Sequence, residues 1–220
     1  MALGNGYIVL LALLAVGLVS AACGSSEPVA LEGQEVREYQ GENLSSIQAF
    51  RENSIAGPQD ISLDEYRLEI TGLVDEPLAL SYDQVLDHRH YSKVVTLDCV
   101  EGWSVKILWE GILLEDLLRQ AGVEDRAVVA IFHAADGYSS SLPLEYVRNN
   151  KIMLAHKMNG VTLPMERGFP FQVVAESKWG YKWVKWVSKI ELSDDPDYRG
   201  YWESRGYNND GDVSGPMFER

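Results

Sequence analysis

Cys99 is the residue in this sequence best suited to chemistry. It lies in the segment Thr96-Leu-Asp-Cys-Val-Glu-Gly-Trp-Ser104, after an apolar run typical of a strand and before a Glu-Gly-Trp turn. The only other cysteine, Cys23, ends a hydrophobic leader, which leaves Cys99 without a disulfide partner in the domain. A lone thiol in this position is a small core residue, a nucleophile or a ligand for a soft metal.

Other residues of the sequence help to choose among these three roles of Cys99. Glu101, two residues after Cys99, is a candidate proton relay, with a solvated turn acid as the alternative. No Cys-x-x-Cys-His motif for covalently attached haem occurs. The histidines lack metal-ligand spacing such as His-x-x-x-His. A thiol hydrolase that pairs Cys99 with His133 or His156 has no supporting signature in the sequence. The four histidines are His88, His90, His133 and His156.

The first residues predict export from the cytoplasm. Residues 1–22 contain no charged side chain, and Tyr7 to Val19 form an apolar run that is followed by Ser20-Ala-Ala-Cys23. This pattern predicts a signal peptide over residues 1–22, and its end resembles a bacterial lipobox in which Cys23 is lipidated. The alternative is an uncleaved hydrophobic anchor. Both readings predict a membrane-tethered, extracytoplasmic protein.

Composition and charge set the domain organisation. Residues 23–45 are rich in Glu, Gly, Gln and Ser and predict a flexible tether, followed by one domain over residues 46–220. The chain is 46% hydrophobic and has six tryptophans, which is enough for a substantial core. A formal charge of −14 argues against nucleic acid or an anionic lipid surface as partner, since both would be repelled.

The elements that must position Cys99 are many short strands and a few short helices. We expect an α+β domain dominated by β structure, without a Rossmann fold or a Gly-rich phosphate loop. Asn159-Gly160 predicts a tight hairpin turn, and Gly122 predicts the end of a helix. Strands are expected over 66–71, 94–97, 127–132, 152–157, 161–163, 171–175 and 183–192, and helices over 82–87, 113–121 and 141–147.

A set of motifs in a consistent order resembles the molybdopterin-binding domain of the sulfite oxidase family over roughly residues 50–210. The Cys-Val-Glu-Gly-Trp-Ser sequence is most similar to the bacterial catalytic subunit that repairs periplasmic methionine sulfoxide. The motifs are Asp98-Cys-Val-Glu-Gly-Trp-Ser104, Trp109-Glu-Gly111, Ala135-Asp-Gly-Tyr138, Asn159-Gly-Val-Thr-Leu-Pro164, Gly168-Phe-Pro-Phe-Gln-Val-Val174, Lys178-Trp-Gly-Tyr-Lys-Trp-Val-Lys185 and Tyr201-Trp-Glu-Ser-Arg-Gly-Tyr207.

The resemblance implies a mostly β sulfite-oxidase-type fold and a role for each matching residue. Cys99 would be the one protein ligand of a molybdenum ion that a molybdopterin dithiolene also holds, and a soft thiolate suits such a centre. Glu101 would relay protons. The other residues that the resemblance implies at the cofactor are Arg51, Asn53, Arg167, Trp183, Val184 and Lys185.

Two features depart from the family pattern. Gln172 stands where the reductase branch commonly has an arginine, which removes one positive charge from the expected pocket. The leader contains no arginine, although relatives that receive the cofactor before export tend to use twin-arginine signals. The second departure keeps open a metal-free lipoprotein that binds a ligand in the cofactor groove.

The expected activity is two-electron oxygen-atom transfer by a molybdenum-dependent oxidoreductase. Reduction of a sulfoxide or N-oxide, methionine sulfoxide included, is favoured over sulfite oxidation, which is the alternative within the family. Because the chain has no second redox motif, electrons are expected from a membrane haem or quinol-linked partner. Without the extra C-terminal dimerisation domain of longer sulfite oxidases, a monomer is favoured.

Overall fold

The computed structural model describes Met1 and residues 35–219. The predicted signal peptide, Cys23 and most of the predicted tether lie outside the described residues. The described part consists mainly of two five-stranded β sheets with three short α-helices, which confirms the predicted fold class.

The first sheet carries Cys99 at the tip of its longest hairpin. The strand order is β10-β9-β6-β5, β11 pairs with residues 153–155 of β9 while β10 pairs with residues 157–158, and all pairings are antiparallel. Asp98 pairs with Ser104, so the turn between β5 and β6 consists of residues 99–103. The strands are β5 (His90–Asp98), β6 (Ser104–Leu113), β9 (Met153–Met158), β10 (Val161–Thr162) and β11 (Gln172–Val174).

The second sheet combines strands that lie far apart in the sequence. The strand order is β4-β3-β12-β7-β8, in which β12 runs parallel to β3 and antiparallel to β7. The last strand of the domain therefore lies at the centre of this sheet. The strands are β3 (Leu68–Gly72), β4 (Leu78–Leu80), β7 (Val129–Ala134), β8 (Ser139–Pro143) and β12 (Val187–Ser193).

The helices are short and have recognisable ends. In α1 (Tyr82–Leu86), Ser81 and Gln84 form a reciprocal capping box, and α2 (Leu114–Ala121) ends at Gly122 in the left-handed conformation, as predicted. The remaining helices are α3 (Leu144–Asn149) and the 3₁₀ turns η1 (Met165–Arg167), η2 (Gly180–Lys182) and η3 (Glu203–Arg205). Among the described residues, no helix is long and apolar enough to cross a membrane.

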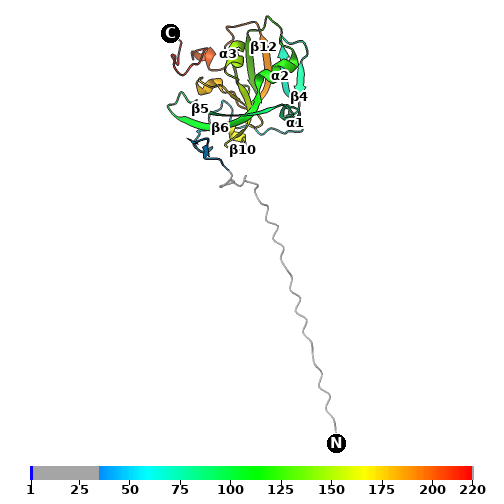
Figure 1. Ribbon diagram of the computed structural model, residues 1–220, viewed down its shortest axis with the longest axis vertical. Coiled ribbons are helices and arrows are strands. Elements are labelled where there is room, and N and C mark those ends of the chain that lie inside the picture. Colours follow the sequence, from blue (N-terminus) through cyan, green and yellow to red (C-terminus); the bar gives the residue numbers. More distant parts are fainter. Residues whose placement is uncertain (2–34, 220) are drawn as a thin grey trace. The chain divides into compact units, whose positions relative to one another are not determined.

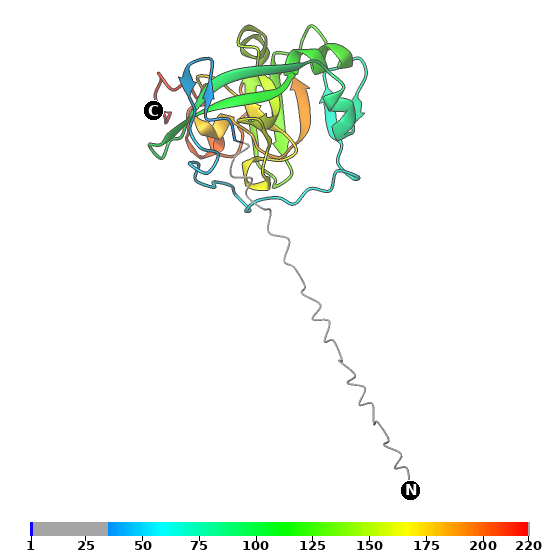
Figure 2. The ribbon, with the colours of Figure 1, turned by 60° about the horizontal axis from the view of Figure 1, so that its bottom comes forward.

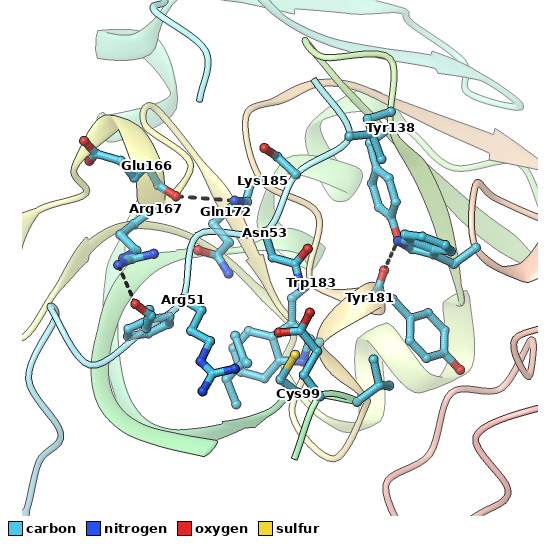
Figure 3. A pocket seen from close by; sticks show the side chains of 18 of the residues that line it. Arg51, Asn53, Cys99, Tyr138, Glu166, Arg167, Gln172, Tyr181, Trp183 and Lys185 are labelled. Atoms are coloured by element: carbon cyan, nitrogen blue, oxygen red, sulfur yellow. Dashed lines mark hydrogen bonds between the residues drawn. The ribbon is translucent and has the colours of Figure 1, made fainter. Parts of the chain in front are cut away.

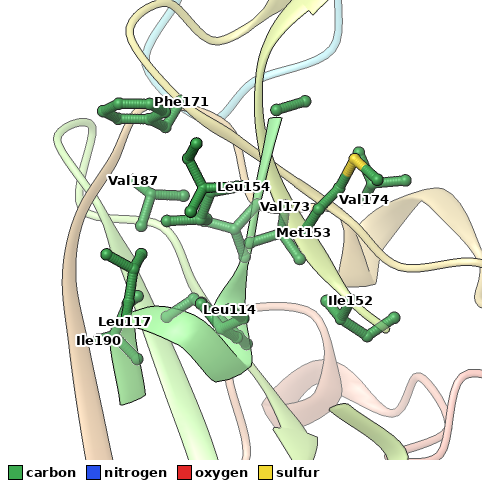
Figure 4. Close-up of a cluster of buried hydrophobic side chains, with 14 of the residues drawn as sticks. Leu114, Leu117, Ile152, Met153, Leu154, Phe171, Val173, Val174, Val187 and Ile190 are labelled. Atoms are coloured by element: carbon green, nitrogen blue, oxygen red, sulfur yellow. The ribbon is translucent and has the colours of Figure 1, made fainter. Parts of the chain in front are cut away.

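The hydrophobic core lies between the two sheets and is closed by helix α2 (Figures 1 and 4). Leu154 and Val173 of the first sheet approach Val187 and Ile190 of the second, and Leu117 of α2 packs beside them. All five side chains are fully buried. Because core interiors are close-packed, this contact fixes how one sheet lies on the other.

Most predicted strands are present, but their boundaries differ; β12, for example, begins at Val187 and not at residue 183, and β4 was not predicted. Residues 141–147 were predicted as one helix, whereas Ser139–Pro143 form β8 and the helix begins at Leu144. Pro143 is the residue before the helix, where its extended backbone suits both elements. Strand β6 was not predicted, because its sequence Ser104–Leu113 contains Gly111 and mixes polar with apolar residues. The Asn159-Gly160 hairpin is confirmed, with a positive φ at both residues.

The domain begins earlier than the predicted boundary at residue 46. Residues 38–43 form a hairpin of β1 (Glu38–Tyr39) and β2 (Glu42–Asn43), which lies beside the β5–β6 hairpin (Figure 2). The Glu35 carboxylate accepts hydrogen bonds from the Ile47 N–H at 2.6 Å and from the amide of buried Asn159 at 2.9 Å. Residues 35–45 therefore belong to the folded domain rather than to a free tether.

Candidate functional site

One pocket gathers most of the predicted site residues. It has a volume of about 290 Å³ and draws on the irregular segment before β3, the β5–β6 turn, η1, β11 and the segment around η2. Figure 3 shows Cys99 and Arg51 on one side, with Arg167 and Lys185 on the other. The predicted residues that line the pocket are Arg51, Asn53, Cys99, Glu101, Arg167, Trp183 and Lys185.

Cys99 is held by the backbone of its own turn. Its N–H donates to the Trp103 carbonyl at 2.8 Å, its carbonyl accepts from the Gly102 N–H at 3.0 Å, and Gly102 has a φ of +84°. The thiol is 7% exposed and is not part of a disulfide. Burial raises the pKa of Cys99, and the Glu101 charge acts in the same direction, while the Glu101 backbone, the Asn53 side chain and the Arg51 charge act against it. A soft cation would favour the thiolate and overcome this effect of burial.

Glu101 lies at the exposed rim of the pocket rather than in the core. Its carboxylate accepts a hydrogen bond from the Trp103 indole N–H at 3.1 Å. The Trp103 ring in turn packs edge-on against Phe50, with ring centroids 6.0 Å apart. The Trp103 indole therefore orients the carboxylate, which remains open to solvent, as a proton relay would require.

Lys185 forms the cationic end of the pocket. Its ammonium lies 2.9 Å from the Glu52 carboxylate, 3.3 Å from the Glu166 carbonyl oxygen and 4.3 Å from the centre of the Trp186 ring. Burial lowers the pKa of Lys185, and the hydrogen bond and charge of Glu52 oppose that effect. A Cβ at Gly168 would lie 3.0 Å from the Lys185 side chain, so the glycine allows this close approach.

Arg167 lies near Lys185 and holds the irregular segment in place. Its guanidinium donates to the carbonyls of Ile47 at 3.3 Å and Phe50 at 3.1 Å, and it stacks on the Phe50 ring at 4.8 Å. Burial lowers the pKa of Arg167, but an arginine stays charged at neutral pH. The positive charge therefore remains available to an anion in the pocket.

Two carboxamides complete the polar lining. Asn53 is exposed and lies close enough to Cys99 to affect its thiol, while Gln172 is only 3% exposed. Gln172 is fixed by the pairing of β11 with β9, and its side chain faces the pocket (Figure 3). Its carboxamide makes no hydrogen bond to any other residue between 35 and 219. A buried carboxamide without a hydrogen-bond partner in the protein is suited to bond to a ligand.

Not every predicted residue presents a side chain to the pocket. Val184 is fully buried outside the lining, and its carbonyl accepts from the Val173 N–H at 2.9 Å. The nearby lysines are engaged elsewhere: Lys178 pairs with Asp212, Lys182 with Glu203, and Lys189 with Glu191. Lys185 lines the pocket, whereas these three lysines do not. His133 and His156 do not line it, so the geometry gives Cys99 no histidine partner for a thiol hydrolase.

Apart from Trp183, the aromatic residues that line the pocket were not predicted as site residues. The Trp202 and Tyr207 side chains come from the C-terminal segment, which folds back so that the Trp179 N–H bonds to the Gly211 carbonyl at 2.7 Å. Both lie within the Tyr201–Tyr207 motif, which was the available signal. The aromatic residues that line the pocket are Phe50, Trp103, Tyr138, Tyr181, Trp183, Trp186, Trp202 and Tyr207.

The donor set fits a molybdenum–molybdopterin cofactor. A single thiol at one end offers the soft ligand, and the guanidinium and ammonium at the other end suit a phosphate. The open carboxamide of Gln172 lies between flat apolar walls, as a polar heterocycle requires. No cluster of three or more His, Cys, Asp or Glu side chains that could hold a metal occurs among the described residues.

Comparison with known proteins identifies relatives. The chain is 33% identical over 151 residues to the "Uncharacterized oxidoreductase YuiH" of Bacillus subtilis (strain 168), which covers 68% of this chain and 76% of that protein. It is 33% identical over 147 residues to the protein-methionine-sulfoxide reductase catalytic subunit MsrP of Gluconobacter oxydans (strain 621H), with coverages of 59% and 47%. It is 30% identical over 189 residues to mitochondrial sulfite oxidase of Homo sapiens, with coverages of 72% and 34%. The chain thus spans less than half the length of the last two relatives.

Structural comparison supports the fold. The sulfane dehydrogenase SoxCD of Paracoccus pantotrophus superposes with a TM-score of 0.64 at 24% identity, over 84% of this chain and 57% of that one. The family described as the oxidoreductase molybdopterin binding domain matches residues 55–202. This range contains Cys99, Glu101, Arg167, Gln172 and Lys185, and the match confirms the predicted cofactor and enzyme class. The chain belongs to the oxidoreductase molybdopterin-binding domain family.

Proposed function

We propose that this protein reduces a sulfoxide by two-electron oxygen-atom transfer at a molybdenum ion held by Cys99. The observation that carries the proposal is the single buried thiol at one end of a pocket whose other end is cationic. The name of the Gluconobacter relative supports a methionine-sulfoxide substrate. Sulfite oxidation is the second outcome to test, because human sulfite oxidase is also a relative.

The net reaction assigns distinct tasks to the residues. A sulfoxide, two electrons and two protons give a thioether and water, and the cofactor supplies the redox chemistry when bound. Glu101 would deliver protons at the rim, since its carboxylate is held by Trp103 and reaches solvent. Arg167 and Lys185, with Trp183 beside them, would hold the cofactor phosphate, and Asn53 would hydrogen-bond near the thiolate.

The backbone beside Lys185 supports the predicted contribution of Val184. In the described part of the chain, neither the Val184 N–H nor the Lys185 N–H donates to another residue. Backbone N–H groups next to a lysine ammonium form a suitable cradle for a phosphate. Val184 would therefore contribute through its backbone and not through its buried side chain.

The location of the protein and its electron donor are part of the same proposal. The predicted signal peptide over residues 1–22 and lipidation at Cys23 would leave the domain tethered outside the cytoplasm. Because no second redox motif occurs in the sequence, electrons would come from a membrane haem or quinol-linked partner. Mass spectrometry of the membrane-extracted protein against Cys23→Ala tests the tether, since the wild type should begin at a lipidated Cys23 and the variant should lack the mass of the lipid.

Elemental analysis tests the central claim. Full-length protein purified from a cofactor-competent host should contain about one molybdenum per chain, and Cys99→Ser should contain almost none. Reduced-dye assays should then show turnover of methionine sulfoxide, with trimethylamine oxide and sulfite as comparison substrates. Metal-free protein from that host would refute the proposal, and oxidation of sulfite without reduction of any sulfoxide would reverse its direction.

A further inference from the structure

An aromatic strip runs from the pocket to the surface of the domain. It consists of Tyr181, Tyr207 and Phe218. The ring centroids of Tyr181 and Tyr207 lie 5.2 Å apart, and those of Tyr207 and Phe218 lie 4.7 Å apart. The two tyrosines line the pocket, whereas Phe218 lies outside the lining. The exposed fraction rises from 8% for Tyr181 to 52% for Phe218, so the aromatic wall of the pocket continues onto the surface.

The inner end of the strip begins beside the turn that carries Cys99. A Cβ at Gly180 would lie 3.7 Å from the Cys99 Cα, and Tyr181 is the next residue of that segment. Figure 3 shows Tyr181 on the side of the pocket opposite Arg167. A molecule that approaches Cys99 over the strip therefore arrives from the side away from Arg167.

Hydrogen bonds hold the strip in place. The Tyr181 hydroxyl donates to the Asn208 carbonyl at 2.7 Å. The Asn208 N–H donates to the Met217 carbonyl at 3.0 Å, and the Glu219 N–H donates to the Gly206 carbonyl at 3.0 Å. The last two bonds flank the exposed ring of the strip on both sides. A surface that is already ordered loses little conformational entropy when a partner binds.

The strip is suited to a polypeptide and not to a small molecule. Few bonds separate the sulfur of a methionine from its Cα, so a methionine sulfoxide in the pocket brings the neighbouring residues of its chain to the rim. An extended chain advances about 3.3 Å per residue, so the strip can contact up to about three of these neighbours. Aromatic rings bury a large apolar area and are enriched at protein interfaces. A small substrate inside the pocket makes no use of Phe218, which lies outside the lining.

We propose that the aromatic strip binds the apolar residues that flank an oxidised methionine in an unfolded polypeptide. This inference rests on the proposed sulfoxide reduction and adds a docking surface to it. Apolar side chains suit the exposed ring, and they are accessible to a partner where a polypeptide is unfolded. The reaction at the sulfur is unchanged, because Phe218 contacts the residues beside the sulfoxide and not the sulfoxide itself.

Steady-state kinetics of the molybdenum-loaded full chain, with a reduced dye as electron donor, test the docking surface. The probes are N-acetylmethionine sulfoxide amide and two unstructured peptides, one with leucines and one with serines beside the sulfoxide. In Phe218→Ser, KM for the leucine peptide should rise about tenfold while kcat stays within about twofold. KM for the amide and for the serine peptide should not change. Phe218→Leu should restore part of the affinity. Leu63→Ser, at another exposed apolar residue, is the matched control and should behave as the wild type.

Each other result has a distinct meaning. Equal increases in KM for the amide and the leucine peptide would overturn the inference, because Phe218 would then support the pocket and not the flanking residues. An unchanged KM for the leucine peptide would also overturn it. If only turnover driven by a membrane fraction of the host fell, the strip would serve the electron donor and the inference would again be wrong. Failure of the loaded wild type to reduce any sulfoxide would refute the proposed function itself, which the other outcomes leave standing.

Discussion

The Lys185 ammonium lies 2.9 Å from the Glu52 carboxylate, so the cation proposed to bind the cofactor phosphate already has a protein counter-ion. Burial alone would raise the pKa of Glu52, but the hydrogen bond and charge of Lys185 lower it overall. Glu52 belongs to the irregular segment that also contributes Arg51 and Asn53 to the pocket. The pair therefore couples the position of this segment to the charge of the phosphate end.

Replacement of Glu52 by Gln should strengthen anion binding. The amide keeps the shape of the side chain but no longer neutralises Lys185, so affinity for inorganic pyrophosphate should rise about three- to tenfold. Titration calorimetry of cofactor-free protein measures this change, and Lys185→Met should abolish the binding. A weaker affinity in Glu52→Gln would show that Glu52 shapes the site and does not compete for it.

Gln172 should matter for the cofactor and not for the fold. Because its carboxamide has no described protein partner, Gln172→Leu should leave the midpoint of thermal unfolding of cofactor-free protein unchanged or slightly raised. The molybdenum content after dialysis should fall at least severalfold, since the ligand would lose a buried hydrogen bond. Gln172→Glu is the matched polar variant. A large loss of stability in the cofactor-free Leu variant would contradict this reading.

Lys182 and Glu203 form a fully buried ion pair at 2.7 Å, with further hydrogen bonds from Ser140 to Glu203 and from Lys182 to the Asn209 carbonyl. Lys182→Met should reduce the free energy of unfolding by about 3–5 kcal/mol, because it leaves the Glu203 charge buried and unpaired. The double variant with Glu203→Leu should recover most of that loss. Urea denaturation compares the wild type, the two single variants and the double variant, and additive losses in the double variant would contradict the pairing.

His156 should make stability depend on pH. Burial, with the charges of His90 and Lys157, lowers its pKa to about 4 from the ordinary histidine value of 6.5. As the pH falls below 6.5 the unfolded chain takes up the proton first, so stability is full above that pH and declines towards pH 4. The loss at pH 4 should be about 3 kcal/mol. His156→Gln should flatten the pH profile of urea unfolding over this window, and an unchanged slope would exclude His156 as its source.

Local sequence signals predicted the elements that depend on neighbouring residues. The helix end at Gly122 and the Asn159-Gly160 turn each depend on a few neighbouring residues, and both are present. Cys99 was predicted to be a site residue because a cysteine without a disulfide partner beside a turn has few possible roles. Such features can be predicted because their energetics involve no distant part of the chain.

Features that depend on tertiary contacts were missed. The pairing of Lys182 with Glu203 joins residues that have no local pattern in common, so no sequence signal indicated it. Trp202 and Tyr207 reach the pocket because the C-terminal segment folds back onto Trp179. Strand β6 was also missed, because Gly111 is tolerated there for its close approach to Leu154 of β9, which no local propensity records.

The hydrogen bonds of Glu35 define where the chain can be shortened. A protein that starts at residue 46 would lack both the carboxylate and the Val36 N–H that bond to buried Asn159. Such a protein would also lack Ser45, whose carbonyl accepts a hydrogen bond from the Asn159 amide. Shortened versions for crystallisation or metal analysis should therefore begin after the hydrophobic leader and before Glu35. The β9–β10 turn then keeps all of these hydrogen bonds.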